Sequence, residues 1–183
     1  DFDDIANPQA FANQPHTAWG FYGHRLNLYR ATTPHAGFAI LRRIADAMPF
    51  GAFVFTSNVD GHFSKAGFSE YRIVECHGSI HFMQCSGSCM GHIWPAGYFT
   101  PEIDEENCRM VSEMPHCDLC GSIARPNIMM FGGYGWYSDR NEAQEEHFRA
   151  WRHNVERPVV IEIGAGEAIP SVRHFGESQG CPI

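Results

Sequence analysis

Apolar residues follow two different spacings along this chain. Over residues 8–30, large apolar side chains recur mostly at every third or fourth position, which predicts a helix that Pro15 splits near its start. The same spacing over residues 34–48 predicts a second helix, with Pro34 at its opening position. An amphipathic pattern predicts a third helix over residues 139–153.

Short apolar runs between these helices predict strands over residues 52–56, 71–76, 127–131 and 159–163. The last run, VVIEI, is apolar enough to be a parallel strand that is buried on both faces. A polar turn and a short helix that ends at Gly67 follow the first run. Strands that alternate with helices predict an α/β domain with a largely parallel sheet, in which ligands bind beyond the carboxyl ends of the strands.

The composition narrows the classes of protein to consider. A chain of 183 residues, 44% of them apolar, is long enough to bury one good core. The net charge is −8, Lys65 is the only lysine and no basic stripe is present, which argues against nucleic acid as a partner. No apolar run reaches membrane-spanning length and no signal peptide is visible, so we expect a cytoplasmic protein without a membrane partner.

Four of the seven cysteines form two close pairs within residues 79–125, where single aromatic residues alternate with Cys, Gly and Pro. The pairs read 85-CSGSC-89 and 117-CDLC-120, and Gly121 after the second pair suits the tight turn of a metal knuckle. Four thiolates make a closed tetrahedral site without an open position for chemistry. We therefore predict one structural Zn²⁺ per chain, bound by Cys85, Cys89, Cys117 and Cys120.

Other interpretations of the cysteines stay open at this point. The four residues could be reduced thiols without a metal, or the second pair could be a redox-active Cys-x-x-Cys. Cys108 and His116 are alternative ligands if Cys89 points away from the site. Cys76 and Cys181 are expected to lie outside it.

Polar residues follow the first two predicted strands. Asn58 and Asp60 lie in the turn after residues 52–56, and both are also good N-cap residues for the helix that follows. His77, followed by Gly78, ends the second strand. It is a candidate general base, because an imidazole titrates near neutral pH.

Two further features give weaker signals. The turn Gly164-Ala165-Gly166 could bring main-chain N–H groups close to a ribose or a phosphate, but a lone Gly-x-Gly is usually only a turn. The remaining histidines have no context comparable to that of His77, and this group includes His35, His62 and His81.

Taken in order along the chain, these segments resemble the sirtuin family of NAD-dependent protein deacylases, in its bacterial form. TSNVDGHFSKAG is similar to the family's Thr-Gln-Asn-x-Asp-Gly…Ala-Gly loop, and VECHGSI to its strand that ends in His-Gly. The cysteine pairs lie between that His and 125-RPNIMMFGG-133, which resembles the family's Arg-Pro-Asp-x-Val-x-Phe-Gly-Glu. VVIEIGAGEAIPSV resembles the strand and Gly-Thr-Ser turn that contact the cofactor. The chain departs from the family pattern at Ser57, Gly133, Ala165 and Gly166.

The resemblance implies a Rossmann-like α/β fold with a mostly parallel sheet, a small zinc-binding module and a helical segment. The expected NAD-binding domain covers residues 34–80 and 125–183, with a zinc module inserted at residues 81–124. Residues 1–33 would form a helical segment associated with the small domain. The family's first strand and its Gly-Ala-Gly loop have no counterpart in this sequence, so residue 1 is expected to lie just after them.

The resemblance also implies an activity, the transfer of an acyl group from a protein lysine to ADP-ribose with release of nicotinamide. His77 would be the base, Asn58 would orient the ribose and Asp60 would hold the nicotinamide carboxamide. The residues expected to contact NAD are Thr56, Ser57, Asn58, Val59, Asp60, Gly164, Ala165 and Gly166. An acyl-lysine peptide would pair as an added strand with main-chain groups of Ile128, Met130, Phe131 and Gly132.

Two rival functions stay open. The same histidine, asparagine and aspartate would serve ADP-ribosyl transfer or NAD hydrolysis. A non-catalytic, zinc-stabilised binding module is the second rival. The sequence does not indicate an oligomeric state.

Overall fold

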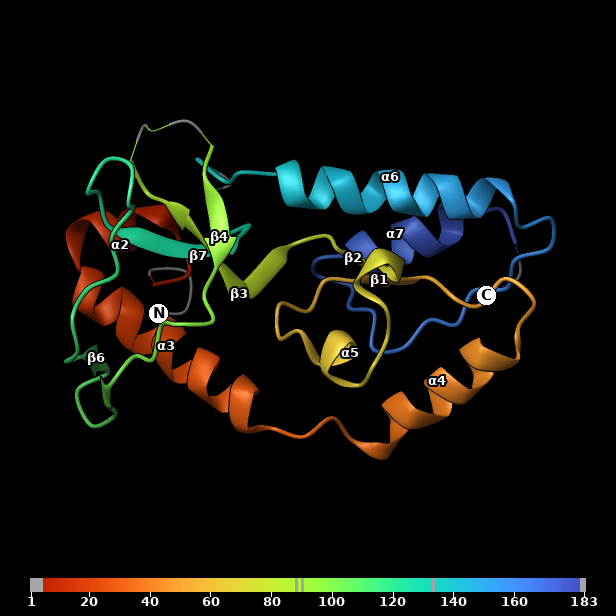
Figure 1. Cartoon of the computed structure of the whole chain (residues 1–183), viewed down its shortest axis with the longest axis horizontal. Helices are drawn as coiled ribbons and strands as arrows, with labels where there is room; N and C mark the ends of the chain where they lie inside the picture. Colours follow the sequence, from red (N-terminus) through yellow and green to blue (C-terminus); the bar gives the residue numbers. More distant parts are fainter. Residues whose placement is uncertain (1–4, 88, 90, 133, 182–183) are drawn as a thin grey trace. The chain divides into compact units, whose positions relative to one another are not determined.

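The computed structural model describes residues 5–87, 89, 91–132 and 134–181, which form two compact units (Figure 1). Unit 1 comprises Asp1–Thr33, Val59–His62 and His77–Arg140, and unit 2 comprises Pro34–Asn58, Phe63–Cys76 and Asn141–Ile183. In chain order the elements are α2 (Pro8–Asn13), α3 (Pro15–Ala31), α4 (Ala36–Ala47), β1 (Val54–Thr56), α5 (His62–Lys65), the 3-10 turn η1 (Glu70–Arg72), β2 (Ile73–Glu75), β3 (Gly78–Cys85), β4 (Ile93–Pro95), β5 (Ile103–Asp104), β6 (Arg109–Met110), β7 (Ala124–Ile128), α6 (Asp139–His153) and α7 (Ser171–Ser178).

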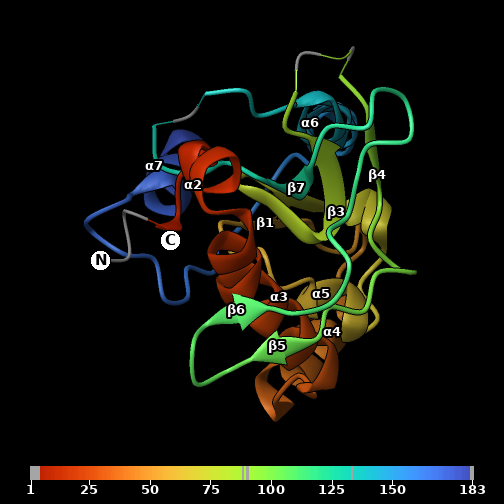
Figure 2. The same cartoon turned by 90° about the vertical axis from the view of Figure 1, so that its left-hand side faces the viewer.

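Unit 1 combines helices α2 and α3 with an antiparallel sheet of strand order β4-β3-β7. The two helices are separate because Pro15 begins α3, as the sequence predicts. In the centre of the sheet, Met83 of β3 lies opposite Trp94 on one side and Pro126 on the other. The small pair β5–β6 lies beside α3 (Figure 2).

The core of unit 1 lies between α3 and the β4-β3-β7 sheet. Trp19 is fully buried there, and its indole N–H donates to the carbonyl oxygen of Ala124 on β7 at 2.9 Å. Gly20, the next residue of α3, lies so close to the carbonyl oxygen of Cys108 that a Cβ at this position would collide with it. A glycine in the middle of a helix costs stability, and here it allows this close approach.

Unit 2 contains the parallel pair β1–β2, in which Val54 lies opposite Ile73 and Thr56 opposite Glu75. Aromatic side chains of helices pack against β1 and the residues before it. The ring of Phe55 stacks on Phe175 of α7 with centroids 3.7 Å apart. Parallel strands packed against helices form the α/β arrangement that the alternating pattern predicts.

Helix α6 closes the second edge of β2. The N–H of Glu75 donates to Oε1 of Gln144 at 3.0 Å, and Nδ2 of Asn141 donates to the carbonyl oxygen of Glu75 at 3.3 Å. All three residues are buried. The two amide side chains therefore take the hydrogen bonds that a neighbouring strand would make.

We expect Gln144→Leu to destabilise unit 2 by about 1–3 kcal/mol, because the buried N–H of Glu75 would lose its acceptor. Urea unfolding followed by circular dichroism measures the change. The matched control is Glu146→Leu, which places the same side chain at an exposed position of the same helix. Equal unfolding midpoints for the two variants would show that the edge contact contributes nothing.

Several predicted elements are confirmed with small shifts of their ends. The helix predicted over residues 139–153 has the bounds of α6, and residues 34–48 contain α4. The first two predicted strands contain β1 and β2, and the short helix before Gly67 is α5. The predicted domain boundaries stay a prediction.

The strand predicted over residues 159–163 is wrong. These residues form no strand, and Val159, Ile161 and Ile163 are 74%, 57% and 67% exposed. An apolar run supplies β propensity, but a strand forms only where another strand offers hydrogen bonds. In the part of the chain that the structure describes, β1 and β2 are the only parallel pair, and α6 occupies the second edge of β2.

The strand predicted over residues 127–131 is shifted and has a different partner. Strand β7 spans Ala124–Ile128 and runs antiparallel to β3 in unit 1, so it does not extend the parallel pair. The apolar pattern placed its start too late because Arg125 is charged and nevertheless buried. Among the described residues, no helix combines the length and the apolarity needed to cross a membrane.

Candidate functional site

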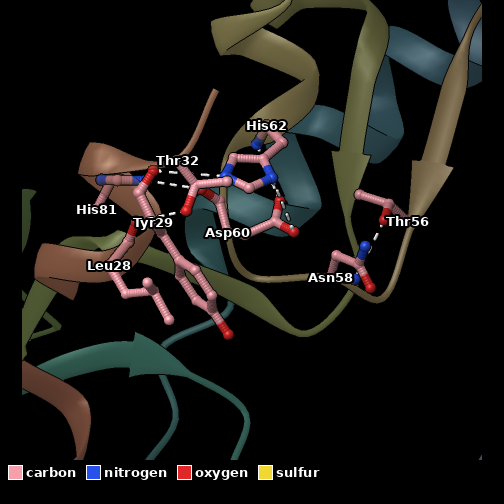
Figure 3. Close-up of polar contacts among 8 residues, drawn as sticks. All are labelled: Leu28, Tyr29, Thr32, Thr56, Asn58, Asp60, His62 and His81. Carbon is pink, nitrogen blue, oxygen red and sulfur yellow. Dashed lines mark hydrogen bonds and ion pairs between the residues drawn. The ribbon is translucent and has the colours of Figure 1, made fainter. Parts of the chain in front are cut away.

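The turn after β1 carries the first of the polar residues predicted to bind a ligand. The hydroxyl oxygen of buried Thr56 accepts a hydrogen bond from the N–H of Asn58 at 3.1 Å (Figure 3). The carbonyl oxygen of Thr56 accepts from the N–H of Cys76 at 2.9 Å. These bonds fix the turn in unit 2, where Ser57 is half-buried and Asn58 is exposed.

Asp60 belongs to unit 1, where two histidines hold it (Figure 3). The N–H of His62 donates to its Oδ1 at 2.9 Å, and Nδ1 of His62 lies 3.6 Å from its Oδ2. The carbonyl oxygen of Asp60 lies 2.9 Å from Nε2 of His81, which can only be a donor in this pair. Asp60 therefore binds the first N–H of α5, which is the capping role considered from the sequence, while its second carboxylate oxygen faces a histidine ring.

The segment that contains Asp60 is bonded along strand β3. The N–H of Ile80 donates to the carbonyl oxygen of Val59 at 3.0 Å. Gly61 has a φ of +70°, and a Cβ at this position would lie 2.6 Å from Cδ2 of His81. Only glycine combines this backbone conformation with so close an approach to the imidazole ring.

His77 directly precedes β3 and is half-buried. Burial disfavours the charged imidazolium and lowers the pKa of His77 from its ordinary value. Gly78 has a φ of +81°, and a Cβ there would collide with the carbonyl oxygen of Asn127 on β7. Gly78 thus lets β3 approach β7 closely. The preceding residue, His77, stays neutral down to a lower pH than an ordinary histidine because its pKa is lowered.

Of the four residues predicted to bind a peptide, the structure buries Ile128 and Met130 and exposes Phe131 and Gly132. The N–H of Met129 donates to the carbonyl oxygen of His77 at 2.9 Å, and the N–H of Phe131 donates to that of Ala6 at 2.9 Å. These two bonds hold the segment within unit 1. Gly133, one of the departures from the family pattern, lies outside the described residues.

A buried polar network lies under this segment, and sequence reasoning missed it. Oε1 of Gln84 accepts from Nδ2 of Asn127 at 3.0 Å and from the N–H of Tyr137 at 3.3 Å. The guanidinium of Arg125 donates to the carbonyl oxygen of Gly135 at 2.9 Å, and burial lowers the pKa of Arg125 to about 10. The network fixes the segment that follows β7.

The four predicted zinc ligands come together in unit 1, with all four Sγ atoms within 4.8 Å of one another. Sγ of Cys85 lies 3.4 Å from that of Cys120, and Sγ of Cys89 lies 3.5 Å from that of Cys117. A zinc ion bonded to four sulfurs at about 2.3 Å separates them by about 3.8 Å, so the donor set fits this metal.

Cys108 and His116, the alternative ligands considered from the sequence, do not belong to this cluster among the described residues. Cys108 is exposed, and Nδ1 of His116 is 2.9 Å from the carbonyl oxygen of Gly121. Hydrogen bonds from Ser122 lower the pKa of Cys120 to about 6, which favours the thiolate that a metal binds. The hydroxyl of Tyr137 donates to the carbonyl oxygen of Cys89 at 2.8 Å, which connects the cysteine cluster to the network under residues 128–132.

The turn at Gly164 is also ordered by side chains. Gly164 has a φ of +66°, which favours glycine. The guanidinium of Arg173, on α7, donates to Oε1 of Glu162 at 3.0 Å and to the carbonyl oxygen of Ala165 at 3.3 Å. Gly164 and Gly166 are exposed, so a ligand can approach their main chain closely.

The structure thus connects predicted residues of unit 1 with two histidines that the sequence did not single out. His62 and His81 both contact Asp60, although neither had a context in the sequence comparable to that of His77. A weak signal was present for His62, because a residue two positions after an aspartate can bond its carboxylate in a turn. No such signal exists for His81, which reaches Asp60 from a distant strand.

Comparison with known proteins supports the resemblance seen in the sequence. The family model described as the Sir2 family matches residues 1–168. NAD-dependent protein deacylase 1 of Archaeoglobus fulgidus is 30% identical over 133 residues, which cover 71% of this chain and 47% of the relative. The NAD-dependent protein deacylase of Leptospira interrogans is 33% identical over 130 residues, covering 71% and 48%. The chain spans about half the length of the curated relatives it matches.

Solved structures share the fold at lower sequence identity. A Sir2 homolog in complex with NAD has a TM-score of 0.68 at 23% identity, with 98% of this chain and 63% of that chain covered. Sir2 bound to an acetylated peptide has a TM-score of 0.65 at 16% identity, with 98% and 68% covered. These similarities confirm the predicted fold class, a Rossmann-like α/β fold, and the cysteine cluster fits its zinc-binding module.

Proposed function

Because the chain belongs to the Sir2 family, we propose that it functions in NAD-dependent protein deacylation. The observation that best supports this function is the arrangement around β3. His77 directly precedes that strand, and the segment with Asp60 is bonded to Ile80 and His81 of the same strand. The candidate base and the candidate cofactor-binding carboxylate thus both lie beside the same strand of unit 1.

The residues present fit the groups that NAD offers. The carboxylate of Asp60 accepts hydrogen bonds, as the carboxamide of nicotinamide requires, and the exposed amide of Asn58 can donate to and accept from ribose hydroxyls. The exposed main chain at Gly164 and Gly166 allows a close approach of the rest of the dinucleotide. Bound NAD would supply the ADP-ribose group that receives the acyl group, with nicotinamide as the leaving group.

In this proposal His77 takes a proton from a hydroxyl group and so makes that oxygen a better nucleophile. The burial that lowers the pKa of His77 keeps its imidazole in the neutral form that accepts a proton at pH 7. The zinc cluster takes no part in the chemistry, because four sulfur ligands leave the metal without an open position.

We propose that the acyl-lysine peptide adds as a strand along residues 128–132. The N–H groups of Met129 and Phe131 point to one side of the segment, where they donate within unit 1. In an extended chain, the main-chain groups of Met130 between them point to the other side. The peptide is therefore proposed to pair with the main chain of Met130. The exposed side chain of Phe131 would contact the peptide beside it.

The test is an assay of the 183-residue chain with NAD and an acetyl-lysine peptide, with all products identified by mass spectrometry. We expect free lysine peptide, nicotinamide and acylated ADP-ribose in equal amounts, and no peptide product when NAD is left out. Nicotinamide release that is independent of the peptide would favour NAD hydrolysis instead. An intact peptide and intact NAD would contradict an enzymatic function and favour a zinc-stabilised binding module.

We also infer that the protein works in the cytoplasm, without nucleic acid or a membrane as its partner. The net charge of −8 supports the absence of a nucleic-acid partner. None of the seven cysteines forms a disulfide, which fits a reducing compartment. Cell fractionation followed by immunodetection tests the location.

A further inference from the structure

We propose that His62 is a positioning residue, whose imidazole holds the carboxylate of Asp60 in the orientation that binds the cofactor. This inference rests on the proposed function, because it concerns the carboxylate that would hold the nicotinamide carboxamide. It adds a residue whose side chain had no assigned role. The contacts that support it all lie within unit 1.

The first support is the way in which His62 contacts both carboxylate oxygens. Its main-chain N–H donates to Oδ1 of Asp60 at 2.9 Å, and its ring Nδ1 lies 3.6 Å from Oδ2. The second distance is longer than a hydrogen bond, so Nδ1 faces Oδ2 without bonding it directly. The side chains of His62 and Asp60 are only 13% and 18% exposed, so little solvent competes for this contact.

The second support is the anchoring of the His62 ring from helix α3. Its Nε2 lies 3.4 Å from the carbonyl oxygen of Tyr29, and the Tyr29 ring packs edge-on against the imidazole with centroids 6.0 Å apart (Figure 3). The two ring nitrogens therefore face different partners, Nε2 the carbonyl oxygen of Tyr29 and Nδ1 the carboxylate of Asp60. Helix α3 thus fixes the ring, and the ring fixes the carboxylate.

The third support is that the main chain of Asp60 is held separately. Nε2 of His81 bonds the carbonyl oxygen of Asp60 at 2.9 Å, and Ile80 bonds that of Val59 at 3.0 Å. With the backbone fixed to β3, the remaining freedom of Asp60 is the rotation of its side chain. Among the described contacts, the main-chain N–H of His62 holds Oδ1, and the imidazole of His62 is the side chain that faces Oδ2.

Two substitutions distinguish the contributions of the two ring nitrogens of His62. His62→Asn keeps an N–H close to the position of Nδ1, which faces Asp60, whereas His62→Gln keeps one close to the position of Nε2, which faces Tyr29. We expect the KM for NAD to rise about tenfold in His62→Gln and His62→Ala, but less than about threefold in His62→Asn. kcat should change by less than about twofold, because the lost interaction is one made in the bound ground state. Equal KM values for His62→Asn and His62→Gln would overturn the proposal.

A second readout needs no NAD. Two-dimensional ¹⁵N NMR of the histidine rings should show that the Nδ1 resonance of His62 moves in Asp60→Asn, because Nδ1 faces that carboxylate. An Nδ1 resonance of His62 that is the same in the wild type and in Asp60→Asn would overturn the proposal without any assay of activity. Failure of the wild type to bind NAD would instead contradict the proposed function, so the two failures are distinguishable.

His16 provides the matched control. Its Nδ1 also contacts a carbonyl oxygen, that of Met110 at 2.8 Å, and it lies in unit 1 outside the segment of Asp60. His16→Asn and His16→Gln should leave the KM for NAD unchanged. Thermal unfolding of all variants separates a lost orientation from a lost fold, because His62→Gln should raise KM with a melting temperature equal to that of His62→Asn.

Discussion

Cys117→Ser is expected to remove the bound zinc and to unfold the cysteine-containing part of unit 1. Cys117 is fully buried in the same core cluster as Met110, and its Sγ is 3.5 Å from that of Cys89. A structural zinc site supplies about 10–16 kcal/mol of apparent binding energy, whereas a whole domain is stable by only about 5–15 kcal/mol. Loss of one of the four ligands is therefore expected to lower the free energy of unfolding of this part of the chain enough to unfold it.

Metal analysis of the purified chain should give about one zinc for the wild type and much less for Cys117→Ser. A strong chelator should lower the melting temperature of the wild type and leave that of the variant unchanged. Cys108→Ser is the control, because Cys108 is exposed and lies outside the cluster. A wild-type chain that folds without metal and resists the chelator would refute a structural zinc site.

His77→Ala is expected to lower kcat/KM for deacylation by about 10²- to 10⁴-fold, the usual contribution of a general base. The fold should survive, because His77 is only half-buried and precedes the strand rather than lying inside it. Initial rates with NAD and an acetyl-lysine peptide measure the loss. His24→Ala is the control, since His24 lies on α3 and its ring faces Glu105 at 3.4 Å. Unchanged turnover in His77→Ala would exclude His77 as the base.

The lowered pKa of His77 also predicts the pH profile of the wild type. A base acts in its deprotonated form, so activity should fall as the pH drops through the pKa of His77. Since burial lowers that pKa below the ordinary 6.5, the fall should begin at a lower pH than for an exposed histidine. An acid limb centred above pH 6.5 would show that another group titrates or that His77 is not buried during catalysis.

The sequence predicts the features whose signals are local. Helix α6 has the predicted bounds because helical periodicity is a property of neighbouring residues. The cysteine cluster was predictable because the short spacing within each pair lets both cysteines bind the same metal ion. His77 and Gly78 were singled out for the same reason, as adjacent residues at the end of an apolar run.

Contacts between distant segments were not predictable from such signals. His81 and Asp60 are 21 residues apart, and Glu75 and Gln144 are 69 residues apart. No spacing rule says which residue of a strand will face a loop, or that helix side chains will occupy a strand edge. The exposed run at residues 159–163 shows the same limit, since its apolar pattern carries no information about whether a partner strand is present.

We expect that exposed run to affect how copies of the chain behave at high concentration. Glu162 is its only charged residue, and Arg173 lies 3.0 Å away and neutralises it. A short segment of β-branched residues without net charge or proline can pair with the same segment of another copy and start an intermolecular sheet. Association of this kind grows steeply with protein concentration. The ion pair with Arg173 cancels the charge of Glu162 that would otherwise keep two such segments apart. The same arginine that orders the turn at Gly164 is therefore expected to favour self-association of the protein.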